Sequence, residues 1–149
     1  MSDKLKGIVT RVLLTKQNGL SITVDASKIL ETAHLLKNLK FDHVISVTAT
    51  DYPEENRIDV IYHVSSFEDL ELAKTILEIR TTVSRQEPNI HTLVAVWPSI
   101  EFLERETTDL MGINFGGREA MARLLLPEDF EGEPPLRKSY TIRTEGIDA

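Results

Sequence analysis

The sequence contains no cysteine among its 149 residues. This absence excludes disulfide bonds, zinc sites built from thiolates, and iron–sulfur clusters held by cysteines of this chain. Long hydrophobic runs are missing as well. The longest wholly apolar run, residues 93–97, is far shorter than the ~20 residues of a transmembrane helix, and the N-terminus has no apolar core of signal-peptide length. We expect a protein of a reducing cytosol, held by a partner if it works at a membrane.

Positive charge is in deficit: the net charge is -7, which argues against nucleic-acid binding. The deficit is uneven, because residues 1–40 carry a net charge of +4 and residues 41–149 therefore carry -11. We expect any partner of the second part to be basic. The sequence has no Gly-x-Ser-x-Gly nucleophile elbow. Its four histidines are scattered along the sequence, so we expect them to be ordinary side chains on the face of a sheet rather than ligands of a metal site.

Hydrophobic periodicity predicts an α+β domain over residues 1–112. Apolar residues at helical spacing predict an amphipathic helix over residues 26–38, with Asp25 or Ser27 as its cap. Residues 8–14 and 21–24 are either a hairpin around the Asn-Gly turn or a helix followed by a strand, and the pattern leaves both open.

Strict alternation of apolar and polar residues predicts a β-hairpin from residues 43–50 and 57–65, joined by a turn that contains Pro53 and Asn56. Residues 77–83 also alternate, which favours a further strand over a helix that continues from Glu68. The expected fold is an antiparallel sheet of three or four strands with helices on one face.

A charged helix follows, beginning at Pro98-Ser99 and ending at Gly112, which suits a left-handed C-cap. Its apolar stripe runs from Ile100 to Met111, and Arg105 can pair with a carboxylate four residues to either side. Four carboxylates on one short helix indicate a solvated face or a salt-bridged partner surface. Metal binding and acid–base catalysis are weaker alternatives, because the spacing matches no ligand signature.

Residues 113–149 form the strap, a segment rich in proline and glycine that carries several large apolar residues. Its glycine loop, NFGG, is neither a dinucleotide-binding nor a phosphate-binding pattern. Proline prevents regular helix and central strand, so the strap buries little of itself. We expect it to lie along its own domain or along another subunit.

The region from Trp97 to Lys138 resembles one protein family, the 30 kDa subunit of respiratory complex I, found also in membrane-bound hydrogenases and archaeal dehydrogenases. The ordered motifs that carry the resemblance are Trp97-Pro98, Glu104-Arg105-Glu106, Asp109-Leu110-Met111-Gly112-Ile113, Phe115, Leu124-Leu125-Leu126-Pro127-Glu128-Asp129 and Pro135-Leu136-Arg137-Lys138.

The resemblance implies a non-catalytic assembly subunit without cofactors in the peripheral arm, on the cytoplasmic face of the membrane. Its expected partners are the large subunit related to the nickel–iron hydrogenase large subunit, a small iron–sulfur subunit nearby, and membrane subunits indirectly. Iron–sulfur clusters, and nickel–iron in a hydrogenase, would belong to those partners. The expected partner-binding residues are Glu104, Arg105, Glu106, Asp109, Gly112, Leu126, Pro127, Phe130, Leu136, Arg137 and Lys138.

Two further hypotheses come from other functional classes. A small carboxylate-dependent enzyme would use Glu104, Glu106 and Asp109, and it predicts a pocket that holds a carboxylate with a raised pKa. A free-standing adaptor predicts a stable monomer with a strap that is disordered alone. The sequence does not select the electron donor or acceptor of an oxidoreductase complex.

Overall fold

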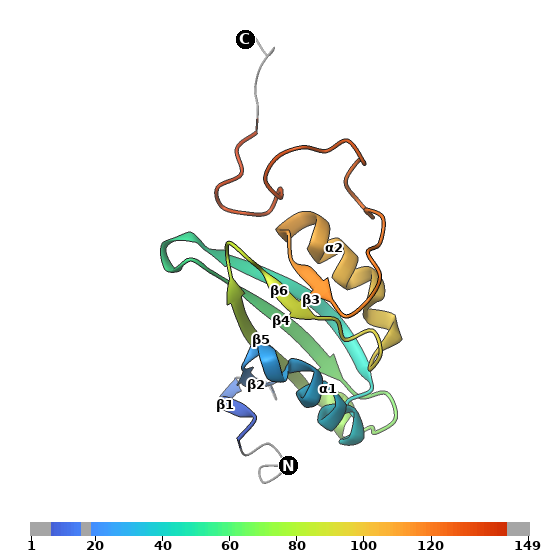
Figure 1. The fold of residues 1–149 in the computed structure, drawn as a ribbon. Coiled ribbons are helices and arrows are strands. Elements are labelled where there is room, and N and C mark those ends of the chain that lie inside the picture. Colours follow the sequence, from blue (N-terminus) through green and yellow to red (C-terminus); the bar gives the residue numbers. More distant parts are fainter. Residues whose placement is uncertain (1–6, 16–18, 143–149) are drawn as a thin grey trace, which may run out of the picture.

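The structure, a computed structural model, describes residues 7–15 and 19–142. Five strands form one sheet in the order β1-β2-β5-β4-β3 (Figure 1). Their bounds are β1 Val9–Thr15, β2 Gly19–Val24, β3 His43–Tyr52, β4 Arg57–Ser65 and β5 Ile76–Ser84. The α+β class is confirmed, and so is the β3–β4 hairpin. The first two strands also form a hairpin, which decides between the two alternatives for this region; the expected Asn18-Gly19 turn lies partly outside the described residues.

The sheet has five strands instead of the expected three or four, and one of its pairings is parallel. β2 runs parallel to β5, whereas the other three pairings are antiparallel. The cause is the connection through helix α1 (Ile29–Asn38), which carries the chain from β2 to the far edge of the sheet at β3. The β3–β4–β5 meander then returns to β2, and this long-range pairing has no local signature.

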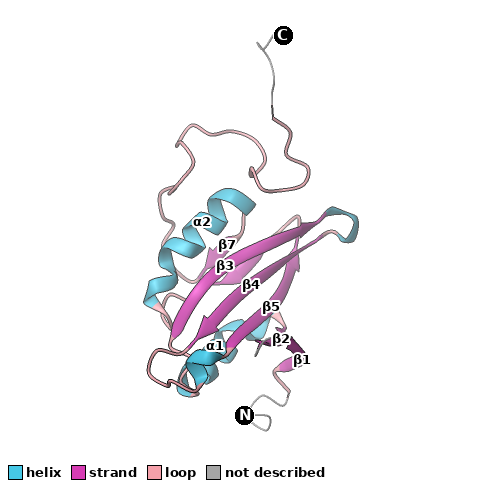
Figure 2. Ribbon diagram, turned by 180° about the vertical axis from the view of Figure 1, so that it is seen from behind, coloured by secondary structure: helices cyan, strands magenta, loops and turns pink. Residues whose placement is uncertain are grey.

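The two helices, α1 and α2 (Glu101–Met111), lie on the same face of the sheet, as expected. Figure 1 shows both helices on the near face, and Figure 2 shows the opposite face, over which neither helix lies. Each helix is preceded by a 3₁₀ turn, Ala26–Lys28 before α1 and Pro98–Ile100 before α2. Asp25 caps the first turn by accepting a 2.8 Å hydrogen bond from the backbone N–H of Ser27.

The core fills the space between the sheet and the helices. The alternating residues of β4 that were expected on one face are all buried, and they pack with Ile29, Ala33 and Leu36 of α1 and with Ile100 and Met111 around α2. Trp97 is buried as a core anchor, and its indole N–H donates a 3.0 Å hydrogen bond to the carbonyl of Phe41. This bond satisfies the polar atom of a large apolar side chain.

A second, two-stranded sheet joins the strap to the domain. β6 (Asn89–His91) pairs in parallel with β7 (Asn114–Gly116), and Ile113 and Phe115 are buried. The first residues of the strap are therefore part of the domain core, and regular structure ends at Gly116. Ile113 and Phe115 lie in the segment that the sequence assigns to the strap, and β7 is held to the domain by its pairing with β6.

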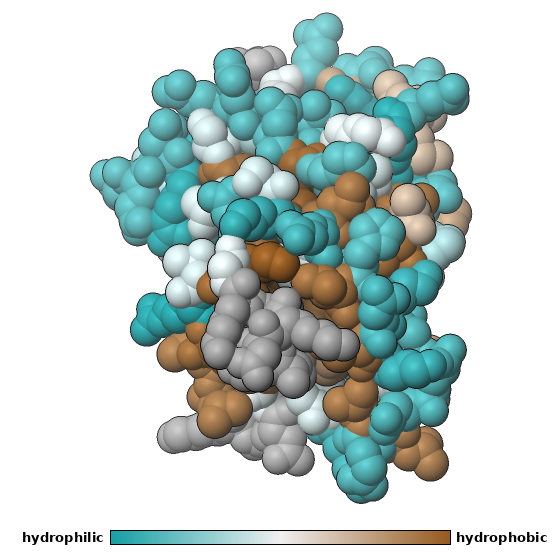
Figure 3. All heavy atoms as spheres, turned by 60° about the horizontal axis from the view of Figure 1, so that its bottom comes forward, coloured by the Kyte–Doolittle hydropathy of each residue, from teal (hydrophilic) through white to brown (hydrophobic). Residues whose placement is uncertain are grey.

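The end of the molecule that carries β1 and α1 exposes apolar side chains, drawn in brown in Figure 3. In β1, Val12, Leu13 and Leu14 are exposed. Among the described residues, no helix combines the length and the hydrophobicity needed to cross a lipid bilayer.

Candidate functional site

The candidate site is built on α2 and on the strap that returns to it. Gly112 ends α2 with a left-handed φ of 72°, and its N–H donates to the carbonyl of Thr108, which confirms the predicted C-cap. A Cβ atom at this position would lie 2.7 Å from Cγ of Pro134 and 3.1 Å from the guanidinium of Arg137. The glycine is needed both for the turn and for the close approach of the strap.

Glu104, expected on the charged face, is fully buried, with an exposed fraction of 0%. Its carboxylate accepts hydrogen bonds from the hydroxyl of Thr92 at 2.5 Å and the backbone N–H of Leu93 at 2.8 Å. Burial raises the pKa of Glu104 above its usual value, although these hydrogen bonds and the nearby Arg118 oppose the rise. The carboxylate therefore links α2 to the segment that follows β6.

The raised pKa of Glu104 is the property that a carboxylate-dependent enzyme would require. However, Glu104 has no exposed surface, and both of its oxygens bond to groups of its own chain. Among the described residues, no group of three or more His, Cys, Asp or Glu side chains could hold a metal ion. The geometry gives Glu104 a structural task.

Asp109 holds the strap against α2. One of its carboxylate oxygens, Oδ2, accepts hydrogen bonds from three successive backbone N–H groups, those of Leu124, Leu125 and Leu126, at 2.9, 2.7 and 3.1 Å. Burial alone would raise the pKa of Asp109, but the three bonds outweigh it and hold the pKa below its usual value. A short segment without regular structure is thereby fixed in one conformation.

Arg105 does not pair with Glu101 or Asp109, although the helical spacing allows both pairs. Instead, its guanidinium donates a 3.0 Å hydrogen bond to the carbonyl of Ala122, in the strap. Its buried Nε has no hydrogen-bond partner among the described residues. Glu106, the other charged residue predicted here, is exposed to solvent.

A pocket of about 360 Å³ opens between α2, β7 and the strap; we call it the α2 pocket. Its walls combine charged side chains with Phe115 and small residues of the strap. The lining residues are Arg105, Thr108, Asp109, Asn114, Phe115, Gly116, Arg118, Glu119, Ala120, Met121 and Ala122.

The later part of the strap is clamped to the C-terminus of α2. The N–H of Leu136 donates to the carbonyl of Leu110 at 2.9 Å, and the guanidinium of Arg137 donates to the carbonyl of Met111 at 2.9 Å. Both acceptors are helix-end carbonyls that lack an intrahelical partner. Arg137 supplies positive charge where the helix dipole is negative.

Two residues that were not selected from the sequence, Asp51 and Arg85, also hold the end of the strap. We call their contacts, together with those of Leu136 and Arg137, the clamp. Asp51, at the end of β3, is buried and forms two hydrogen bonds with Arg85, the shorter at 2.8 Å. Asp51 also accepts a 3.0 Å bond from the N–H of Lys138, and Arg85 donates to the hydroxyl of Ser139. Burial would raise the pKa of Asp51, but Arg85 and the Lys138 N–H outweigh it and lower the pKa.

The remaining predicted partner-binding residues lie in the strap between Leu125, whose N–H Asp109 binds, and Arg137. They are Leu126, Pro127, Phe130 and Leu136. Arg123 donates 2.8 Å hydrogen bonds to the carbonyls of Pro127 and Phe130, which closes this part of the strap into a loop. Leu126 and Phe130 are partly buried, Pro127 is exposed, and Leu136 is 60% exposed. The predicted residues thus lie on α2, at its C-cap, or in the strap that is hydrogen-bonded to the helix.

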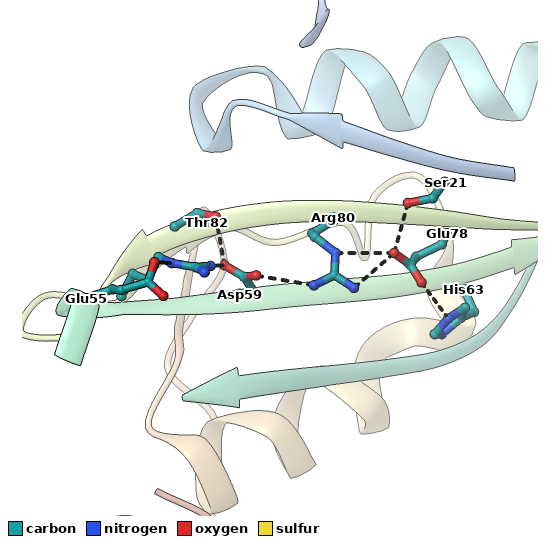
Figure 4. Close-up of polar contacts among 8 residues, drawn as sticks. Ser21, Glu55, Asp59, His63, Glu78, Arg80 and Thr82 are labelled. Carbon is teal, nitrogen blue, oxygen red and sulfur yellow. Dashed lines mark hydrogen bonds and ion pairs between the residues drawn. The ribbon is translucent and has the colours of Figure 1, made fainter. Parts of the chain in front are cut away.

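The uncovered face of the sheet carries a chain of ion pairs. Arg80 lies between Glu78 and Asp59, at 3.2 and 3.3 Å, and Glu78 lies 3.6 Å from His63 (Figure 4). Arg57 pairs with the other oxygen of Asp59, and the hydroxyls of Ser21 and Thr82 donate to the two carboxylates. These groups largely neutralise one another, so the network serves the pairing of β2, β5 and β4.

Comparison with known proteins gives consistent results. A family model described as "Respiratory-chain NADH dehydrogenase, 30 Kd subunit" matches residues 22–146. The NADH-quinone oxidoreductase of Moorella thermoacetica has a subunit that is 36% identical over 127 residues, which cover 85% of this chain and 82% of that protein. The F(420)H(2) dehydrogenase of Methanosarcina mazei has a subunit that is also 36% identical, over 78% of this chain and 72% of that protein.

A solved structure is similar over most of the chain. One chain of the membrane-bound sulfane sulfur reductase, an archaeal respiratory membrane complex, superimposes with a TM-score of 0.81 at 25% identity. The match covers 93% of the present chain and 81% of the chain in that complex.

Proposed function

The chain belongs to the 30 kDa subunit family of the respiratory-chain NADH dehydrogenase, and from this membership we propose that it is a non-catalytic assembly subunit. It would work in the peripheral arm of a complex I-like oxidoreductase or of a membrane-bound nickel–iron hydrogenase-type complex. Its main partner would be the large subunit related to the nickel–iron hydrogenase large subunit, with the small iron–sulfur subunit nearby.

The observation that carries this proposal is the ordered but outward-facing strap. Asp109 fixes residues 124–126 and Arg137 fixes the region of Leu136, yet Leu125 is 54% exposed and Leu136 is 60% exposed. Apolar side chains held out to solvent on a fixed backbone are typical of a surface that another protein covers. A partner that covers them would not have to order the strap first.

In this proposal the electron-transfer chemistry belongs to other subunits. The chain has no cysteine to hold an iron–sulfur cluster, and the two buried carboxylates of α2, Glu104 and Asp109, are engaged with backbone N–H groups of the same chain. We therefore assign the iron–sulfur clusters, and nickel–iron in a hydrogenase-type complex, to the partners. The chain would reach the cytoplasmic face of the membrane through those partners, and the membrane subunits would contact it indirectly.

Affinity purification tests the proposal. The tagged chain is recovered in mild detergent from membranes of the organism that encodes it, and the co-purifying proteins are identified by mass spectrometry. We expect a hydrogenase-type large subunit and cluster-bearing subunits in stoichiometric amounts, and the remaining subunits would identify the complex. Recovery of the chain alone would contradict an assembly role.

A further inference from the structure

Strand β1 forms one edge of the main sheet (Figure 1). Among the described residues it pairs only with β2, in a regular antiparallel register over residues 11–15. The free side of an edge strand presents a row of backbone N–H and C=O groups, and another extended segment is what matches such a row. Ile8 and Val9 pack against the core, so the strand is anchored to the domain at its start.

The opposite edge of the sheet, at β3, is protected. Helix α2 packs against β3, the clamp attaches the strap to Asp51 near the end of that strand, and a bulge between Val44 and Ser46 interrupts its register. Uncovered edge strands are usually kept from pairing by charged side chains, prolines or bulges. Residues 11–15 of β1 include one charged residue and no proline. Within the described part of the chain, the open edge of the sheet is therefore the one at β1.

The side chains of β1 are apolar on both faces of the strand. Val12 lies opposite the buried Ile22. Leu13 lies opposite Ser21, which belongs to the ion-pair network of the uncovered face. Since directly paired residues share a face, Val12 and Leu14 lie on the helix side and Leu13 lies on the other. The exposed fractions of Val12, Leu13 and Leu14 are 57%, 45% and 88%. A strand that is apolar on both faces is typical of a sheet interior, whereas β1 lies at an edge.

The charge of this part of the chain is positive. Residues 7–28 contain three lysines or arginines and one aspartate, a net charge of +2. On the uncovered face, the carboxylate of Glu78 already pairs with Arg80 of the same strand. A second copy of this chain, paired edge to edge, would bring like charges together, whereas aspartate or glutamate on an added strand is attracted. The charge therefore favours an acidic strand of a different protein over a second copy.

We propose that β1 receives an extended segment of a partner subunit, which adds a further strand to the open edge of the sheet. This inference rests on the proposed assembly function. The segment carries apolar residues on both of its faces, which cover the exposed side chains of β1, and at least one aspartate or glutamate beside Arg11. Main-chain hydrogen bonds supply the affinity of such a contact, and the side chains fix its register.

The contact at β1 is separate from the contact at the strap. Figures 1 and 2 show β1 and the strap at opposite ends of the molecule. The chain therefore holds partner segments at two ends, which is the arrangement that an assembly subunit requires.

Photocrosslinking identifies the added strand. A photoreactive benzoylphenylalanine replaces Leu13 in the tagged full-length chain, the assembled complex is purified, and the crosslinked peptide is sequenced by mass spectrometry. We expect a peptide of another subunit in which apolar residues flank an aspartate or glutamate. A crosslink to a second copy of this chain or to its own residues 1–6, or no crosslink to another subunit in the assembled complex, would overturn the inference.

Variants then test the contact in the full-length chain, expressed in place of the wild type. Leu14→Glu places a charge within the apolar contact and repels an acidic strand, so we expect roughly tenfold less of the co-purified subunit that supplies the strand. Leu70→Glu is the matched control, because Leu70 is also a strongly exposed leucine, at 79%, but lies outside the sheet edge; it should leave recovery unchanged. Arg11→Glu should reduce recovery, whereas Arg11→Lys keeps the charge and should retain it.

Hydrogen exchange measures the main-chain bonds directly. We expect backbone amides within residues 11–15 to exchange at least about tenfold more slowly in the wild-type complex than in the wild-type chain alone. Equal exchange in the two samples, or normal recovery with both Leu14→Glu and Arg11→Glu, would contradict the inference. Either result, together with normal recovery of partners by the wild-type chain, would leave the proposed function intact. Absence of partners from the wild-type chain would instead refute the proposed function itself.

Discussion

Asp109 of α2 accepts a 2.7 Å hydrogen bond from the backbone N–H of Leu125, 16 residues further along the chain. This bond is the central one of three that attach the strap to the helix. The same bonds leave the side chain of Leu125 54% exposed. The helix therefore orders a segment that has no regular structure of its own.

Asp109→Asn should release the strap without unfolding the domain. The amide keeps the shape but loses the charge that strengthens three hydrogen bonds, so we expect the free energy of unfolding to fall by about 2 kcal/mol. Hydrogen exchange should show faster exchange at the amides of residues 124–126. Glu106→Gln, an exposed carboxylate on the same helix, is the control and should change stability by less than about 0.5 kcal/mol. Unchanged protection of the three amides would refute this role.

The stabilisation from Asp109 also has a predicted pH dependence. Its pKa is lowered in the folded chain, so its contribution is fully present above the unfolded-state pKa of about 3.9. The contribution is lost as the pH falls through the lowered pKa. Urea denaturation of the wild type and of Asp109→Asn should therefore give stabilities that converge only in strong acid.

Gly112→Ala should damage both the helix end and the attachment of the strap. A side chain at a left-handed φ costs about 1–2 kcal/mol, and the new Cβ would also meet Pro134 at 2.7 Å. Gly132→Ala is the matched control, because Gly132 has a positive φ but nothing within 4 Å of its Cβ position. Urea denaturation should show a larger loss for Gly112→Ala than for Gly132→Ala, and equal losses would contradict the close contact with the strap.

Asp51→Asn should weaken the clamp at the end of the strap. Arg85 and the N–H of Lys138 would lose a charged acceptor, and we expect a loss of stability larger than that from breaking an exposed ion pair. The N–H of Lys138 should exchange faster, because it donates to the same carboxylate. Glu71→Gln breaks an exposed pair with Lys74 and should cost less than about 1 kcal/mol. An Asp51→Asn loss as small as that of Glu71→Gln would show that the clamp adds little.

Glu104 should give the opposite pH dependence to Asp109. Its pKa is raised in the folded chain, so folding favours the protonated form, and its contribution to stability decreases as the pH rises from the unfolded-state pKa through the folded-state pKa. Glu104→Gln does not titrate. The stability of the wild type minus that of Glu104→Gln should therefore fall with rising pH in this window. A difference that is constant with pH would contradict the raised pKa.

Local patterns predicted those parts of the fold whose causes are local. The period of two in β3 and β4, the helical spacing in α1, and the glycine that ends α2 each act over a few residues, and the structure confirms them. The parallel pairing of β2 with β5 was not predicted, because it depends on the path of the whole β2–α1–β3–β4–β5 segment.

The geometry of the candidate site was not predicted from the sequence. Glu104 was placed on a charged outer face, although it lies four residues after Ile100 and three before Thr107, which are both buried. That helical spacing indicates a buried position for Glu104, but its charge led to the prediction of an exposed one. The clamp at Asp51 joins residues 34 and 87 positions apart, so no local pattern could indicate it.

The central claim is that this chain assembles a complex and performs no chemistry. The most direct test replaces the chain by Arg105→Gln in the organism that encodes it, then measures the assembled complex on native gels and the electron-transfer rate per assembled complex. We predict fewer complexes, each with wild-type turnover. A normal amount of complex with lost turnover would contradict the claim and place this chain within the catalytic machinery.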